Sequence, residues 1–235
     1  MNPIDLIEID EYKPWLTGRV PKGYWQIERN RWMAIKWLFQ ERLKWDDEQI
    51  KKEFSDQHLI ENGLRSFITM MSSLYEIVHI YTNGRIKAWE MKKTPKGFFD
   101  EPENRIEAIK WLIEDKLQWN RQDIIDNFNA GTLAEHGLHS LYKNVSSYYD
   151  LLNAAYPGEF YPWEVMGNVH DGYWDDPDNC IKAIYWLLAQ KGLTIDDFLL
   201  GFTNCTFLHE NGFQSIYQKY KNITKLKEEL FPGSM

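Results

Sequence analysis

The sequence predicts an all-α protein made of three tandem four-helix repeats of about 74 residues each. Three observations support this prediction. The same motifs recur in register along the chain, and the apolar residues between them follow the helical period. No alternating apolar and polar stretch is long enough to predict a strand.

The repeat appears as motifs that recur at a spacing of 74 or 75 residues. Residues 21–25 read PKGYW, residues 95–99 read PKGFF and residues 172–174 read GYW. In the same register, ENGLRS at 61–66 matches EHGLHS at 135–140 and ENGFQS at 210–215. Because KPW at 13–15 resembles YPW at 161–163, the head of the chain is interpreted as the tail of a truncated repeat. The predicted division is this tail (1–19), repeat 1 (20–91), repeat 2 (92–165) and repeat 3 (166–235).

Each repeat is predicted to contain four helices in a fixed order. The first carries apolar residues at helical spacing, in repeat 1 at Trp32, Ile35, Leu38, Phe39 and Leu43. The second follows a capping residue, Asp46, Asn120 or Thr194, and ends near Phe54, Phe128 or Phe202. The third begins after the shared glycine, Gly63, Gly137 or Gly212, which is expected in a left-handed turn. The fourth begins at Ser73 or Ser147 and ends at Asn83-Gly84 or Pro157-Gly158.

The repeated tryptophans are interpreted as structural. Trp37, Trp111 and Trp186 occupy one position on the apolar face of the first helix, so we expect them in the core. Trp89 and Trp163 fall at the repeat boundaries, where a large ring is expected to lock one repeat against the next.

Composition and motifs exclude several classes of function. The only cysteines, Cys180 and Cys205, make neither a disulfide framework nor a cysteine zinc site. No apolar run approaches the roughly 20 residues of a membrane span. The chain has no HExxH motif, phosphate-binding glycine loop or GxSxG elbow. We therefore expect a cytoplasmic protein that is not an enzyme and has no cofactor, metal site or small-molecule substrate.

The charge distribution gives the main indication of function. The chain holds 35 acidic and 27 basic residues, a net charge of −8, yet the third helix of every repeat lacks acids. No Asp or Glu lies between Glu61 and Glu76, between Glu135 and Asp150, or between Glu210 and Glu228. The polar residues of these windows predict DNA contacts at Arg65, Ser66, Thr69, His139, Ser140, Lys143, Asn144, Gln214, Ser215, Gln218, Lys219 and Lys221. A mostly buried third helix would also lack acids, and the pattern leaves that alternative open.

These motifs, in their order, resemble the homing endonuclease-associated repeat and related tandem repeats of bacterial and phage proteins. The matching residues in repeat 2 are Gly97-Phe98-Phe99, Ala108, Gly137-Leu138-His139-Ser140, Ser146-Ser147-Tyr148-Tyr149 and Ala154-Ala155. The resemblance implies helix-turn-helix-like modules that bind double-stranded DNA and, without an attached nuclease, a stand-alone regulator. The chain departs from the pattern in its acidic net charge and in Lys221-Asn222, which replaces the serine pair before the fourth helix.

A second hypothesis is a scaffold or inhibitor that binds a protein partner through acidic and aromatic helical surfaces. In one form it mimics DNA with Asp46, Asp47, Glu48, Glu101, Glu103, Asp175, Asp176 and Asp178. The two hypotheses differ in what the third helices do. Exposed basic positions on those helices favour DNA, whereas buried positions beside a continuous acidic face favour the inhibitor.

Overall fold

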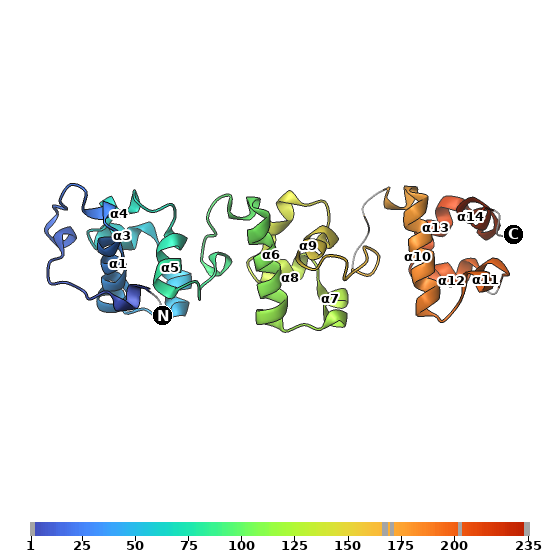
Figure 1. Cartoon of the computed structure of the whole chain (residues 1–235), viewed down its shortest axis with the longest axis horizontal. Helices are drawn as coiled ribbons and strands as arrows, with labels where there is room; N and C mark the ends of the chain where they lie inside the picture. The colour runs from blue at the N-terminus through green and yellow to red at the C-terminus, as the bar shows by residue number, and fades with distance from the viewer. Residues whose placement is uncertain (1–2, 166–168, 170–171, 202–203, 233–235) are drawn as a thin grey trace. The chain divides into compact units, whose positions relative to one another are not determined.

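The computed structural model describes residues 3–165, 169, 172–201 and 204–232. Every regular element in this part of the chain is a helix, so the all-α fold is confirmed (Figure 1). By contacts the chain groups into two compact units, 1–119 with 130–144 and 120–129 with 145–235. The second sequence repeat contributes helices to both units, and its boundaries stay a prediction from the sequence. We call the three repeats copies one, two and three.

The helices follow the same order in each copy. Copy one contains η3 (Tyr24–Gln26), α1 (Glu28–Trp37), η4 (Leu38–Leu43), α2 (Asp47–Glu53), α3 (Asp56–Glu61), α4 (Arg65–Ile68) and α5 (Leu74–Thr82). Copy two contains η6 (Phe98–Asp100), α6 (Pro102–Lys110), η7 (Trp111–Leu117), α7 (Arg121–Asn127), α8 (Ala130–Glu135), η8 (His139–Asn144) and α9 (Tyr148–Ala155). Copy three contains η9 (Tyr173–Asp175), α10 (Pro177–Gln190), α11 (Ile195–Leu199), α12 (Cys205–Glu210), α13 (Gln214–Tyr220) and α14 (Ile223–Leu230). Short 3₁₀ turns η1 (Pro3–Leu6), η2 (Pro14–Thr17) and η5 (Ala88–Glu90) complete the described chain.

The prediction of four helices per copy missed one short helix. α3, α8 and α12 each add six residues directly before the shared glycine. At this length the helical period is hardly visible in the sequence. The glycines have positive φ, +76° at Gly63, +75° at Gly137 and +85° at Gly212, as predicted. The added helix therefore pairs with the third helix across a glycine turn, as in a helix-turn-helix motif.

The first helix ends differently in copy three. In copies one and two it continues as a π-helix, η4 or η7, and ends in a left-handed residue, Lys44 or Gln118. In copy three α10 remains an α-helix through Gln190. Copies one and two have one more residue than copy three between the helix tryptophan and the next N-cap. A π-helix accommodates that extra residue without moving the helices on either side.

The predicted helix caps are confirmed. Asp46, Asn120 and Thr194 each accept a hydrogen bond from the third residue of the following helix. The predicted end of the second helix at Phe202 lies outside the described residues, and α11 ends at Leu199. Asn222 caps α14 by accepting from the backbone N–H of Lys225 at 2.7 Å, as Ser147 caps α9. Copy three lacks the serine pair, but Asn222 supplies the helix cap in its place.

The boundary tryptophans pack against aromatic rings of the copy that follows them. Trp15 packs edge-on against Trp37 with ring centroids 5.4 Å apart, and Trp89 packs against Trp111 at 5.5 Å. Trp163 lies in the same relation to Trp186, at 6.1 Å. Trp15 is 1% exposed and Trp89 4%. Residues 1–19 are therefore not only the tail of a missing repeat, since Trp15 is part of the core of copy one.

Candidate nucleic-acid interface

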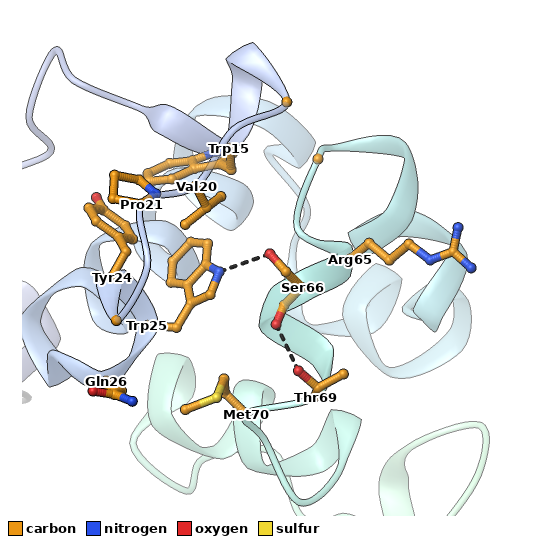
Figure 2. Close-up of a pocket in the computed structure, with 13 residues that line it drawn as sticks. Trp15, Val20, Pro21, Tyr24, Trp25, Gln26, Arg65, Ser66, Thr69 and Met70 are labelled. Atoms are coloured by element: carbon orange, nitrogen blue, oxygen red, sulfur yellow. Dashed lines mark hydrogen bonds between the residues drawn. The ribbon is translucent and has the colours of Figure 1, made fainter.

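The third helix of copy one presents polar side chains beside an aromatic cluster. Arg65, Ser66 and Thr69 on α4 are exposed. The Ser66 hydroxyl accepts a hydrogen bond from the indole N–H of Trp25 at 3.0 Å, and the Thr69 hydroxyl donates to the Ser66 carbonyl at 3.0 Å. Figure 2 shows both bonds, with the Arg65 side chain extending away from the rings. Ser66 therefore positions the helix, and Arg65 remains available to a ligand.

A groove lies between α4 and the segment that precedes η3 (Figure 2). Its volume is about 710 Å³. The walls are Trp15, Tyr24 and Trp25 on one side and Arg65, Ser66, Thr69 and Met70 on the other. Burial, more than the nearby Asp10, raises the pKa of the Tyr24 phenol, so this wall is uncharged at neutral pH.

Copy two has a groove in the equivalent place, and its lining is basic. It has a volume of about 640 Å³ and lies between the 91–97 segment and η8. The predicted residues His139, Ser140 and Lys143 line one side, and His139 and Lys143 are exposed. The helix itself is a 3₁₀-helix here rather than the expected α-helix. The structure does not describe the side chain of Asn144.

Three lysines opposite η8 were missed by the sequence prediction. Lys92, Lys93 and Lys96 line the groove and are exposed. The prediction considered only the windows around the third helix, and these residues lie more than 40 positions earlier in the chain. The sequence did contain an indication that these lysines form a basic surface, because no acid occurs between Glu90 and Asp100. Asp100 is the one carboxylate among the residues that line this groove. Its Oδ2 lies close to Gly97, 3.1 Å from the position that a Cβ on Gly97 would take.

The cations of these grooves lack acidic partners among the described residues. Among the described residues, no carboxylate lies within 4.0 Å of Arg65, Lys92, Lys93, Lys96 or Lys143. Some cations elsewhere do have such partners, in the pairs Arg29–Asp10, Lys51–Glu90, Arg85–Asp47, Lys87–Glu107 and Arg121–Glu164. The pairing matters for Asp47, whose pKa is lowered by the hydrogen bonds from Arg85. The groove cations therefore have their full charge available for an anionic ligand.

Copy three combines exposed polar residues with a structural lysine. Gln214, Ser215 and Gln218 are exposed along α13, as the DNA hypothesis requires. Lys219 instead donates a hydrogen bond to the carbonyl of Trp174, with 2.6 Å between Nζ and O. Lys221 lies in the left-handed turn after α13, at φ +64°. Lys219 therefore has a structural role and is no longer a candidate DNA contact.

Lys219 lies beside a buried thiol and phenol. The Cys180 thiol donates to the same Trp174 carbonyl at 3.2 Å, and burial raises its pKa. Burial, followed by the neighbouring Cys180, raises the pKa of the Tyr220 phenol to about 12. Both groups are neutral at physiological pH, so this cluster supplies no reactive thiolate.

Four of the eight acidic residues proposed for a DNA mimic make contacts within the fold. Asp46 and Asp176 cap helices, and Asp47 and Glu48 pair with Arg85 and with Lys51. The Oδ2 of Asp175 lies close to Gly172, 3.3 Å from the position that a Cβ on Gly172 would take. Glu101 and Glu103 remain exposed at the start of α6. Every member of the set except the half-buried Asp47 is exposed, Asp178 included.

The described residues contain no group of three or more His, Cys, Asp or Glu side chains placed to hold a metal ion. None of their helices combines the length and the apolar character that crossing a membrane requires.

These features define an all-α protein with glycine-linked helix pairs. In copies one and two a groove beside the third helix is lined by cations that have no acidic partner among the described residues. Residues 77–161 match the model of a family described as a protein of unknown function, DUF4046. The matched segment contains copy two from Trp89 through α9, including the basic groove. No curated protein and no solved structure matches the chain.

Proposed function

We propose that this chain is a non-catalytic protein that binds double-stranded DNA through the third helices α4, η8 and α13. One observation carries the proposal. Of the predicted contact residues whose side chains the structure describes, all are exposed apart from the half-buried Ser140, and Arg65 and Lys143 have no acidic partner among the described residues. Exposed amides and cations without nearby carboxylates are suited to base edges and phosphates.

The acidic net charge of −8 limits how such a protein would bind. Each phosphate that a cation neutralises contributes about 0.9 to the salt dependence of binding. With few cations per copy, a single copy binds weakly, and useful affinity needs several copies on one duplex. The excess of acids elsewhere in the chain disfavours non-specific contacts with phosphates, which suits a sequence-selective regulator of the kind that the repeat resemblance implies.

The experiment is a titration of a fluorescently labelled random duplex, followed by anisotropy at about 50 mM and about 200 mM salt. We expect binding that weakens as salt rises. The double variant Arg65→Glu/Lys143→Glu is expected to bind at least 10-fold more weakly, because each substitution places a carboxylate against phosphate. Lys219 is left unchanged because it supports the fold.

The matched control is Lys44→Glu/Lys116→Glu, which makes the same change of charge at two exposed lysines that line neither groove. Circular dichroism checks that both variants keep their helices. If the groove variant and the control bind equally well, the third helices are not the contact. If the unchanged protein does not bind at about 50 mM salt, DNA binding of this non-specific kind is rejected. A pull-down with the whole protein as bait then tests the alternative that its acidic surfaces bind a protein partner.

A further inference from the structure

The turn that leads into the first helix has the same construction in copies one and two. In copy one the N–H of Tyr24 donates to the carbonyl of Pro21 at 3.1 Å, and Gly23 has φ +79° and ψ −1°. In copy two Phe98 donates to Pro95 at 3.1 Å, and Gly97 has φ +77° and ψ 1°. These are the bond and the glycine conformation of a type II β-turn.

This turn holds a lysine at the same position in both copies. Lys22 and Lys96 lie between the proline and the glycine, and both are exposed. A type II turn fixes the backbone of that residue, so the lysine side chain leaves the backbone at a defined position. In copy two the base of the turn is also fixed, because the N–H of Lys92 donates to the carbonyl of Lys51 at 2.9 Å.

Further cations surround each turn. Copy one adds Arg19, and copy two adds Lys92 and Lys93, all exposed. No acid occurs from residue 12 to residue 27 or from residue 91 to residue 99. Among the described residues, none of these five cations has a carboxylate within 4.0 Å. Both turns therefore present exposed cations that no carboxylate of the described residues neutralises.

The turn and the third helix are opposite walls of one groove. In copy two Lys92, Lys93 and Lys96 face the side of His139, Ser140 and Lys143 across the groove. In copy one Gly18, Val20, Pro21 and Gly23 form the corresponding wall opposite Arg65 and Ser66. A ligand that contacts the third helix therefore lies next to the turn.

We propose that these two turns, residues 18–23 and 92–97, clamp the phosphodiester backbone of the duplex that the third helices contact. The inference rests on the proposed function and adds a second contacting element that is separate from the third helices. A polymer with regularly repeated phosphates suits a turn that repeats in the chain with its lysine at the same position. Copy three has no Lys or Arg between Trp163 and Gly172, so the clamp belongs to copies one and two.

The test compares salt dependence in three proteins with the same labelled duplex. The clamp variant is Lys92→Gln/Lys93→Gln/Lys96→Gln, which leaves η8 unchanged. The control is Lys44→Gln/Lys116→Gln/Lys182→Gln, three exposed lysines outside the groove. Glutamine suits the left-handed position of Lys44, because Gln118 occupies it in copy two. We expect the salt slope of the clamp variant to fall by about 2 to 3, since each lost phosphate contact removes about 0.9. The control is expected to keep its slope.

A second variant, Arg19→Gln/Lys22→Gln, tests copy one, with an expected loss of slope of about 2. Equal slopes in the clamp variants, the control and the unchanged protein overturn the clamp while leaving DNA binding by the third helices intact. An equal loss in the clamp variants and the control also overturns it, because net charge alone then explains the effect. If the unchanged protein does not bind the duplex, the proposed function fails first and the clamp fails with it.

Discussion

The ammonium group of Lys219 in copy three takes the place that an arginine fills in the other two copies. Arg31 donates to the carbonyl of Trp25 at 2.7 Å, and Arg105 donates to the carbonyl of Phe99 at 2.6 Å. Copy three has Cys180 at the arginine position, and Lys219 reaches the equivalent carbonyl of Trp174 from α13. A positive charge thus holds the end of the same 3₁₀ turn in all three copies, although it comes from a different helix in copy three.

This exchange predicts a compensating pair of substitutions. Lys219→Asn introduces the residue of copy two and should lower the free energy of unfolding by about 1 kcal/mol, because the carbonyl loses a charged donor. The double variant Lys219→Asn/Cys180→Arg rebuilds the arrangement of copy two and should regain most of that loss. Urea unfolding followed by tryptophan fluorescence measures both. If the second substitution recovers no stability, the two residues do not share a role.

Gly137 and Gly212 should respond differently to alanine. Both have positive φ, which costs an alanine about 1 kcal/mol. At Gly137 the new Cβ would also lie 2.9 Å from the carbonyl oxygen of Trp89, whereas at Gly212 nothing lies within 4 Å. We expect Gly137→Ala to lose about 2 kcal/mol or more and Gly212→Ala about 1 kcal/mol. Thermal unfolding of the two variants provides the comparison, and equal losses would contradict a close contact with the Trp89 carbonyl.

The Tyr220 phenol predicts a loss of stability at high pH. Its pKa is about 12 in the folded chain, against about 10 when unfolded. The unfolded state therefore loses this proton first as pH rises. The stabilising contribution is complete below about pH 10 and is lost between about pH 10 and pH 12, on the order of 2 kcal/mol in all. Tyr220→Phe removes this contribution, so its stability should fall less steeply than that of the parent between about pH 9.5 and pH 11.5 in urea titrations. Parallel curves would mean that Tyr220 titrates normally.

Asn222 should be replaceable by serine but not by alanine. Its side chain caps α14, and Ser147 caps the corresponding helix α9 in the same way. Asn222→Ala is expected to cost about 1 kcal/mol of unfolding free energy, whereas Asn222→Ser should cost a few tenths. Chemical denaturation distinguishes them, and a neutral alanine variant would show that α14 does not depend on its cap.

The features predicted correctly from the sequence are those in which local chemistry decides the structure. A capping side chain such as Asp46 and a positive-φ glycine such as Gly63 act within three or four residues, so their types and spacing predict them. The exposure of Arg65 and Lys143 also follows from charge.

The features that were missed depend on contacts between distant segments. The sequence does not show that Trp89 packs onto Trp111. Nor does it show that Lys96 faces the groove of Lys143, or that Lys219 reaches Trp174, because each pair is brought together by packing of the whole copy. The acid-free stretch around Lys96 was the one available signal, and it becomes meaningful only when the opposite wall of the groove is known.

The position of the boundary tryptophans also has a consequence for the order of folding. Trp15 contacts Trp25 and Trp37, and Trp89 contacts Phe99 and Trp111, so these ring contacts of copies one and two join residues no more than 22 positions apart in the chain. Contacts of short sequence separation close small loops and form early. We therefore expect copies one and two to assemble much of their aromatic centre as soon as the first helix is available, with the glycine-linked helix pair and the groove beside it added afterwards.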